Sequence, residues 1–282
     1  MCRIQDSGLS GFETRGEVTG PMAKRRQMKS DMGWSTADRI VVRGKDLPGE
    51  ILGKLNLGDM AFLELTGRTP DAAESKMFNA MAVTLVEHGI TPSALVARLT
   101  FLGAPEALQA AVAAGLCGLG SVFVGSTEGC ARMLREALPD PKSGADLGTL
   151  AKDLVAACRA RKEIVPGIGH PIHKPVDPRV PRLFALAREC GFHGRYVELI
   201  QRVQAEAERA SGKSLPINAT GAIGAILCEM GFDWRIARGI GVMARAVGLV
   251  GHILEESRQP IAQEVWHRTE EEASAHAKPR SK

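Results

Sequence analysis

The sequence VPGIGHPIHKPVDPR, at residues 165–179, interrupts a chain whose pattern is otherwise helical. Four prolines and two glycines among its fifteen residues exclude a helix or a central strand. The stretch therefore predicts a rigid loop whose backbone N–H and C=O groups face outward, where they can read the edges of a ligand. Two histidines, one lysine and one arginine are grouped from His170 to Arg179, and such basic side chains suit phosphates and carboxylates. The alternative is a solvated basic loop.

His170 and His173 have a spacing that a metal ion could use. No nearby cysteine or acidic partner completes a metal site, so we expect no metal. The basic groups of the loop are expected to meet an anion instead.

Apolar residues at helical spacing dominate the rest of the chain, and the strand signal is a short strand and turn at 38–47. Helices are predicted at 55–65, 71–87, from Thr91 onward, 105–116, 147–162, 182–190, 196–211, 220–230 and 234–256. The fold class is therefore all-α. Glycines at 115–125 resemble a phosphate loop but lack its Lys-Ser/Thr, which favours close helix packing or a turn beside a ligand. The Gly- and Ala-rich stretch 220–256 is expected to be buried, in part at a subunit interface.

The composition of the 282 residues is that of a soluble globular protein, with 44 % apolar and 24 % charged residues. Only 4 % are aromatic and the net charge is +4, which argues against nucleic-acid binding. No run approaches the ~18 apolar residues of a membrane span.

Six scattered cysteines predict buried thiols in a reducing cytoplasm. Residues 1–33 and 267–282 lack apolar periodicity and predict a loose arm and a mobile charged tail.

A histidine ends the apolar helix predicted at 71–87, in the sequence Glu87-His88-Gly89. Taken alone, a histidine at a helix end usually caps carbonyl groups or favours the helix dipole. His88 is therefore a candidate site residue only in combination with other basic groups.

The helix predicted at 234–256 and its exit carry a third cluster of polar residues, after those at 87–89 and 165–179, among otherwise apolar residues. Arg245 and His252 are seven residues apart and share one face, and Arg258 follows at the helix exit. A buried arginine needs an anionic partner. That partner is either a protein carboxylate, such as Glu255 or Glu256, or a carboxylate of the substrate.

These clusters, in this order, resemble the citrate synthase superfamily over about residues 34–266. The motif PGIGH at 166–170, followed nine residues later by Arg179, carries the resemblance most specifically. RGKDL at 43–47 and the spaced residues Ala, Leu, Leu, Gly and Pro of 61–70 support it.

Within the superfamily, the chain resembles the compact citryl-CoA lyase branch, which includes the C-terminal lyase module of ATP-citrate lyase. GLVGH at 248–252, followed by Arg258, is similar to the last helix of that module. The sequence at 120–125 is similar to its phenylalanine-bearing loop.

The resemblance implies an all-helical, citrate synthase-like fold with two domains that close over the substrate. Residues 34–125 and 219–266 correspond to the large domain, and 126–218 to the small domain. It also implies a homodimer or higher homo-oligomer.

The resemblance further implies roles for individual residues. His88 and His170 are expected to hydrogen-bond the oxygen-bearing carbon of oxaloacetate or of the citryl group. The residues expected to bind carboxylates are Arg179, Arg245, His252 and Arg258.

Coenzyme A is expected only as part of the substrate, with no permanently bound cofactor. Lys174 corresponds to a basic residue on the CoA diphosphate. The backbone groups expected to hold the adenine are those of Val165, Gly167, Ile168 and Gly169.

The implied reaction is an aldol-type cleavage of citryl-CoA, or of a related 3-hydroxy-3-carboxyacyl-CoA, to acetyl-CoA and oxaloacetate. Synthases place a histidine in the glycine-rich loop, where this chain has Phe123 and Val124, and the lyase branch also lacks that histidine. The family's acid–base aspartate lies in Asn-Val-Asp-Gly, whereas this chain places Thr220 there, in the sequence Asn-Ala-Thr-Gly. Threonine has no acidity near neutral pH. The alternatives are a citrate synthase and a catalytically silent CoA-binding paralogue.

Overall fold

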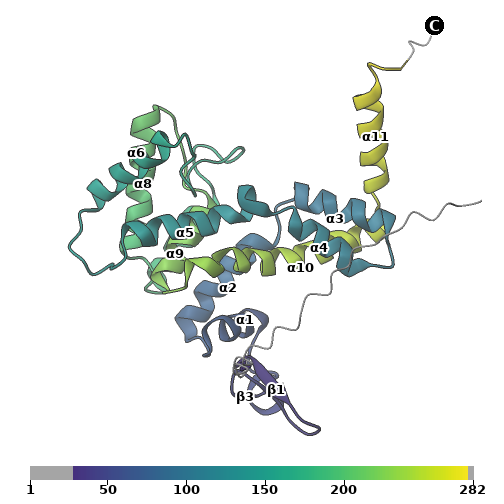
Figure 1. Ribbon diagram of the computed structural model, residues 1–282, viewed down its shortest axis with the longest axis horizontal. Coiled ribbons are helices and arrows are strands. Elements are labelled where there is room, and N and C mark those ends of the chain that lie inside the picture. The colour runs from purple at the N-terminus through teal and green to yellow at the C-terminus, as the bar shows by residue number, and fades with distance from the viewer. Residues whose placement is uncertain (1–27, 279–282) are drawn as a thin grey trace, which may run out of the picture.

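A computed structural model describes residues 28–278 of the chain (Figure 1). The part of the predicted arm before residue 28 and the last four residues of the predicted tail lie outside the described residues. Helices make up most of the described part, which confirms the all-α class. They are α1 (Leu57–Thr66), α2 (Ala72–Val86), α3 (Pro92–Gly103), α4 (Leu108–Cys117), α5 (Gly125–Ala137), α6 (Leu147–Ala160), α7 (Arg179–Glu189), α8 (Arg195–Ser211), α9 (Ala219–Glu229), α10 (Ala237–Arg258) and α11 (Ala262–Ser274). Three single turns complete the set: η1 (Leu47–Ile51), η2 (Gly120–Val124) and η3 (Trp234–Ile236).

Local signals fix the ends of the first helices where the sequence predicts them. Gly67 ends α1 in the left-handed conformation, with a φ of 78°. Asp71 and Glu74 form a capping box at the start of α2. Because α2 stops at Val86, the next two residues lie in the turn that carries His88.

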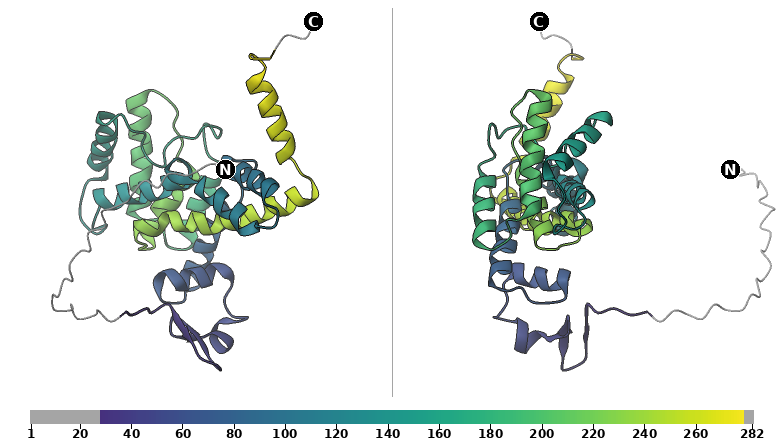
Figure 2. Two further views of the ribbon diagram at one scale, coloured as in Figure 1. Left: turned by 45° about the vertical axis from the view of Figure 1, so that its right-hand side comes forward. Right: turned by 90° about the vertical axis from the view of Figure 1, so that its left-hand side faces the viewer.

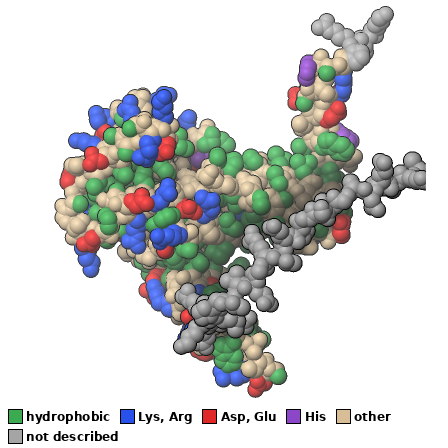
Figure 3. Space-filling model, in the orientation of Figure 1, with side chains coloured by type: hydrophobic (Ala, Val, Ile, Leu, Met, Phe, Trp, Pro, Cys, Tyr) green, Lys and Arg blue, Asp and Glu red, His purple; other side chains and the backbone are tan. Residues whose placement is uncertain are grey.

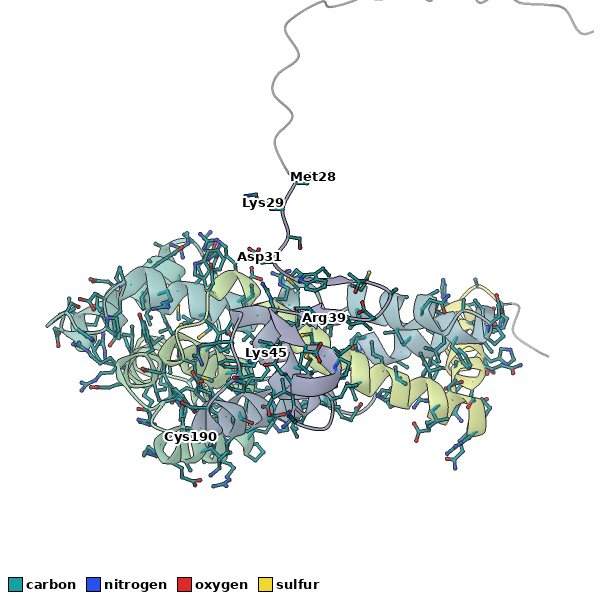
Figure 4. The ribbon with its side chains drawn as sticks, turned by 90° about the horizontal axis from the view of Figure 1, so that it is seen from below. Met28, Lys29, Asp31, Arg39, Lys45 and Cys190 are labelled. Atoms are coloured by element: carbon teal, nitrogen blue, oxygen red, sulfur yellow. The ribbon has the colours of Figure 1, made fainter. Side chains whose placement is uncertain are left out.

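A small antiparallel sheet precedes the helices and lies beneath α1 (Figure 1). Its order is β1 (Gly33–Ser35), β2 (Ile40–Val42), β3 (Lys45–Asp46), which confirms the predicted strand and turn and adds β1. Arg43 and Gly44 form the tight turn, with φ values of 49° and 78°. Figure 4 shows the sheet from below, with Lys45 on β3 and Arg39 in the turn before β2. The sheet is thus an accessory at one end of the helical body.

One main hydrophobic core runs through the described residues. It contains an aromatic group of Phe62, Phe78 and Phe232, with ring centroids 5.5–5.7 Å apart. The same cluster continues into α5, α8 and α9, which belong to both predicted domains. The division into a large and a small domain therefore stays a prediction.

Helix α10 lies along the centre of the molecule (Figure 1) and packs against α2, α3, α4 and α5. By length and composition alone, the segment Trp234–Arg258 could cross a membrane, yet half of its most apolar window is buried inside the protein. A Cβ on Gly248 would collide with the carbonyl oxygen of Val86, and one on Gly115 would lie 2.8 Å from the side chain of Leu249. Small residues thus let α10 pack closely as a core helix, as the sequence predicts.

The predicted mobile tail is wrong over 267–274, because these residues belong to α11. This helix stands away from the body and meets it beside α3 (Figure 2). The carboxylate of Glu256 accepts the N–H groups of Ile261 and Ala262 at 2.9 and 2.8 Å and so caps the start of α11. An i, i+4 pair of Glu264 and Arg268 adds support. Charged residues without an apolar stripe can form a helix when one end is held in this way.

The five cysteines of the described residues are free thiols. Three of them, Cys130, Cys158 and Cys228, are buried, and burial raises the pKa of Cys228 to about 12. These thiols are packing groups, and the cytoplasmic location stays a prediction.

Candidate active site

Three histidines form a cluster between the end of α2 and the loop that joins α6 to α7. The Nε2 atoms of His88 and His173 lie 3.2 Å apart. The ring of His170 stacks beside that of His173, with centroids 4.3 Å apart, and lies 6.1 Å from that of His88. The structure therefore brings together His88 and His170, which the sequence analysis selected, and adds His173.

The loop that carries His170 is held against the segment before α9. The N–H of Gly169 donates to Pro216 at 2.7 Å, and the carbonyl of Gly167 accepts from Asn218 at 3.0 Å. A Cβ on Gly167, whose φ is 83°, would lie 2.6 Å from the Cα of Gly221. Only glycine fits this crossing of two backbones. The loop is therefore held in place by backbone hydrogen bonds and by the close approach of Gly167 to Gly221.

The backbone groups expected to read adenine are mostly used inside the protein. The N–H of Ile168 donates to Val165, that of Gly167 to Ser126, and that of Gly169 to Pro216. The expectation that these N–H groups face outward is therefore wrong. The proline and glycine pattern predicts a rigid loop but does not tell which side of it meets the protein.

His170 has a defined tautomer. Its Nδ1 accepts the backbone N–H groups of Ile172 at 3.1 Å and of His173 at 2.9 Å, so its ring proton lies on Nε2. Burial lowers its pKa, and the charges of His173 and Arg179 lower it further, against an opposing effect of Asp177. At neutral pH, His170 thus presents a neutral N–H donor.

Two predicted arginines act on His88. Burial lowers the pKa of His88 first, followed by the positive charges of Arg179, His173 and Arg245. Contacts place both arginines near the cluster: Arg245 Nη1 lies 3.5 Å from Thr91 Oγ1, three residues after His88, and Arg179 is bonded to Asp177 at the end of the histidine loop. Four of the predicted residues therefore converge on one region.

Arg179 is held by a residue that the sequence analysis missed. The fully buried Asp177 accepts from its Nε at 2.9 Å and from its Nη2 at 2.7 Å. Burial would raise the pKa of Asp177, but the hydrogen bonds from Arg179 and Ala219 outweigh it and lower that pKa. The sequence Asp-Pro-Arg at 177–179 could have indicated this ion pair, because the proline fixes a turn that lets the carboxylate reach the arginine two residues later.

Arg245 is a buried cation that forms no ion pair with a carboxylate of residues 28–278; burial lowers its pKa, and the charge of Glu87 opposes that effect. Its Nη1 donates to Thr91 Oγ1 at 3.5 Å, and its Nε has no hydrogen-bond partner within residues 28–278. Glu255 and Glu256, the two carboxylates named as possible partners, both pair with Arg98 instead. A buried guanidinium in this state is suited to an anionic ligand.

His252 is committed to the protein and is not placed to bind a substrate, contrary to expectation. Its Nδ1 accepts from Arg98 Nη2 at 2.9 Å, so its proton lies on Nε2, 3.0 Å from Glu87 Oε2. The other oxygen of Glu87 accepts the backbone N–H of His88 at 2.8 Å. His252 therefore supports the turn that carries His88, and Arg98 behind it was missed because it comes from another helix.

Arg258 and Lys174 lie outside the cluster. Arg258 is exposed at the end of α10, thirteen residues after Arg245 and so about 20 Å along the helix axis. Lys174 is exposed on the loop and forms no ion pair with any described residue. The structure does not bring Arg258 of the same chain to the site.

Thr220 lies in a chain of hydrogen bonds. Its hydroxyl donates to Asn218 Oδ1 at 2.6 Å and lies 3.1 Å from Ser126 Oγ, which itself accepts the N–H of Gly167 at 3.2 Å. The single proton of Thr220 is thus used within the protein. Its hydroxyl ties α9 to α5 and the loop and offers no acid or base.

Phe123 and Val124 lie in the single turn η2. Val124 is buried against Gly241 of α10, whereas Phe123 is 46 % exposed. Neither side chain can donate a hydrogen bond, as the sequence predicts.

Three imidazoles with donor atoms within 4.8 Å of one another could hold a metal ion. The Nδ1 of His170, however, accepts hydrogen bonds from two backbone N–H groups. Its Nε2 therefore carries a proton and has no lone pair for a metal ion. Arg179 and Arg245 add positive charge. These residues fit an anion better than a cation, and the expectation of no metal stays a prediction.

A family model described as citrate synthase, C-terminal domain, matches residues 50–265. The chain belongs to the citrate synthase family. Among curated relatives, a 2-methylcitrate synthase of Mycobacterium tuberculosis is 28 % identical over 194 residues, which cover 68 % of this chain and 47 % of that protein. A citrate synthase of Acidithiobacillus ferridurans is 28 % identical over 200 residues, 68 % of this chain and 49 % of that protein. The chain thus spans about half the length of these curated relatives.

Solved structures of the family share the fold. The citryl-CoA lyase of Hydrogenobacter thermophilus has a TM-score of 0.73 and 34 % identity, covering 82 % of this chain and 87 % of that one. The ATP citrate lyase of Methanothrix soehngenii, solved with citrate and coenzyme A, has a TM-score of 0.68 and 22 % identity, covering 84 % of this chain and 40 % of that one. The citrate synthase-like fold expected from the sequence is therefore confirmed.

Proposed function

We propose that this chain is a citryl-CoA lyase-like enzyme, which cleaves citryl-CoA or a related 3-hydroxy-3-carboxyacyl-CoA to acetyl-CoA and oxaloacetate. The observation that carries the proposal is Arg245, a buried cation with no ion pair among the described residues and an unpartnered Nε, beside histidines whose pKa burial lowers. Such a site is complete only with an acidic ligand that also accepts hydrogen bonds. The similarity to a citryl-CoA lyase along most of both chains supports the same substrate class.

The ligand's groups match those of the cluster. Its carboxylates pair with Arg245 and with the exposed edge of Arg179, whose side chain is 27 % accessible while Asp177 fixes its position. The oxygen on the tertiary carbon accepts from His170 Nε2. The exposed Lys174 meets the CoA diphosphate at the mouth of the loop. Preorganised donors aimed at a developing charge are often the largest contribution to catalysis.

Cleavage moves one proton. A base takes the proton of the tertiary hydroxyl, the C–C bond breaks as that carbon becomes the ketone of oxaloacetate, and the electron pair forms the enolate of acetyl-CoA. Protonation of the enolate carbon completes the products. Thr220 supplies no titratable group for this transfer, so a histidine of the cluster performs it.

We also propose that the enzyme is a homodimer, formed through an apolar face on α3, α10 and η2. Figure 3 shows hydrophobic side chains gathered over these elements. The exposed apolar residues of this face are Val96, Leu99, Leu102, Val122, Phe123, Met243, Val247, Val250 and Leu254. Those on α10 recur at spacings of three and four, which is the stripe that one helix presents to a partner. A second copy of the chain is the occupant that this extended face suits.

Purified protein incubated with citryl-CoA tests the function, with oxaloacetate read by a coupled reduction and CoA species by mass spectrometry. We expect oxaloacetate and acetyl-CoA in equal amounts. Parallel samples with acetyl-CoA and oxaloacetate test the synthase alternative, which predicts free CoA and citrate. Binding of CoA without turnover of any substrate would support the silent paralogue and contradict the lyase.

A further inference from the structure

Two of the three clustered histidines face each other through the same ring atom. We propose that His88 and His173 share one proton across their Nε2 atoms, and that this pair takes up and returns the proton of the cleavage reaction. The inference rests on the proposed function and deepens it, because it assigns the proton transfer that Thr220 cannot perform. His173 acts through His88 and is therefore a positioning residue.

The distance between the rings requires a shared proton. The two Nε2 atoms lie 3.2 Å apart, with the rings nearly perpendicular at 79°. Two bare lone pairs, or two N–H groups, would repel each other at this distance, so one nitrogen donates and the other accepts. The pair therefore holds one proton between its members when both rings are neutral.

The third histidine is excluded from this exchange by its own hydrogen bonds. Protonation of His170 at Nδ1 would break the bonds from the N–H groups of Ile172 and His173. His170 consequently remains a donor through Nε2. Since the same bonds fix the backbone of His173, they also set the direction from which its ring meets His88.

The surrounding charges limit the pair to a single added proton. Arg179 and Arg245 act on His88 from α7 and α10 and disfavour positive charge there. Asp177 lies toward His170, and Glu87, behind His88, bonds to backbone N–H groups and faces His252. A doubly protonated pair would add two charges beside two arginines, so the pair takes up one proton and then releases it.

The balanced step is short. The proton of the tertiary hydroxyl passes to the free Nδ1 lone pair of His88, whose Nε2–H keeps donating to His173 Nε2. The O–H electron pair forms the C=O bond, and the C–C electron pair becomes the enolate. The pair then returns the proton to the enolate carbon. The pair ends as it began, and no other reactant is needed.

Histidine NMR titration of the full-length protein tests the shared proton without any substrate. Wild type, His173→Gln and His88→Gln, each labelled at the histidine rings, give the assignments. We expect the signals of His88 and His173 to move together in one titration step in wild type. In His173→Gln, we expect the proton affinity of His88 to change by at least threefold. Independent titration of the two rings, with an unchanged His88 curve in the variant, would overturn the proposal.

Kinetics test the role of the pair in catalysis. For His173→Gln, we expect kcat for citryl-CoA to fall by about 10²–10³-fold with KM within about twofold, and the acidic limb of the pH profile to move. His193→Gln, a half-buried histidine packed on Phe184, is the matched control and keeps the wild-type profile. Wild-type kcat and pH profile in His173→Gln would overturn the inference. If wild type cleaves no substrate, the proposed function fails while the titration still decides whether the proton is shared.

Discussion

Asp177 binds Arg179 through both carboxylate oxygens, at 2.9 Å from Nε and 2.7 Å from Nη2. The second oxygen also accepts the N–H of Ala219 at 3.0 Å, at the start of α9. One buried charge thus joins the histidine loop, the first residue of α7 and the first residue of α9. The position of a candidate substrate-binding arginine and the packing of two helices depend on the same carboxylate.

Asp177→Asn removes this charge without changing the size of the side chain. Breaking a buried pair leaves the other group uncompensated, so we expect a loss of about 3–5 kcal/mol in the free energy of unfolding. Urea denaturation measures it. Asp233→Asn is the control, because Asp233 pairs with Arg235 at the same spacing but on the surface, and we expect a much smaller loss there. Equal losses in the two variants would contradict the proposed importance of burial.

The stability contribution of Asp177 depends on pH with a defined sign. Its pKa in the folded protein is lowered, because the bonds from Arg179 and Ala219 outweigh the effect of burial. The contribution is therefore full above the unfolded pKa of about 3.9 and is lost as the pH falls through the folded value. We expect the stability gap between wild type and Asp177→Asn to be constant from about pH 7 to pH 5 and to shrink below pH 4. A gap that widens on acidification would reverse this account.

Gly167→Ala tests the crossing of the loop and α9. The new Cβ would lie 2.6 Å from the Cα of Gly221, in addition to the cost of a positive φ. We expect a loss of more than about 2 kcal/mol by thermal or urea unfolding. Gly53→Ala is the control, since its φ is 72° but nothing lies within 4 Å, and we expect about 1 kcal/mol. Similar costs at both positions would show that the close approach is not restrictive.

Arg245→Met separates stability from function. Removing a buried cation without an acidic partner is expected to raise the free energy of unfolding by about 1–3 kcal/mol. The same change is expected to lower kcat/KM for citryl-CoA by about 100-fold or more, because the ligand carboxylate loses its charged partner. Arg209→Met, which removes an exposed arginine paired with Glu206, serves as control and changes neither quantity strongly. A less stable Arg245→Met protein with full activity would contradict this role.

Placing a charged side chain on the apolar face of α10 tests whether that face forms the proposed dimer. Val250 and Leu254 are about half exposed on α10, and a glutamate at either position would be buried in the interface. We expect wild type to sediment as a dimer and the variants Val250→Glu and Leu254→Glu to sediment as monomers. Leu52→Glu, in the turn beside the small sheet, is expected to leave the dimer intact. A monomeric wild type would remove the proposal.

The sequence predicts the helices well where their ends carry local signals. Asp71 with Glu74, and Gly67, define boundaries through bonds to residues a few positions away. The start of α11 could not be predicted in this way, because its cap is the carboxylate of Glu256 on a different helix.

The same distinction separates the parts of the site. His88, His170 and Arg179 lie in motifs that identify them, and the structure brings them together. The orientation of the His252 ring depends on its hydrogen bond from Arg98, 154 residues away in the sequence. The helical spacing of His252 and Arg245 does not reveal that bond. Burial of Asp177 likewise follows from tertiary packing, which a single sequence does not display.

The most direct test of the central claim compares wild type and His170→Ala in the cleavage of citryl-CoA, with folding of both checked by circular dichroism. The account predicts oxaloacetate release by wild type and none above background by the variant, because the fixed Nε2–H donor is lost while the backbone bonds of Gly167 and Gly169 to the segment before α9 remain. Equal release by the two proteins would contradict the claim that this histidine cluster is the active site.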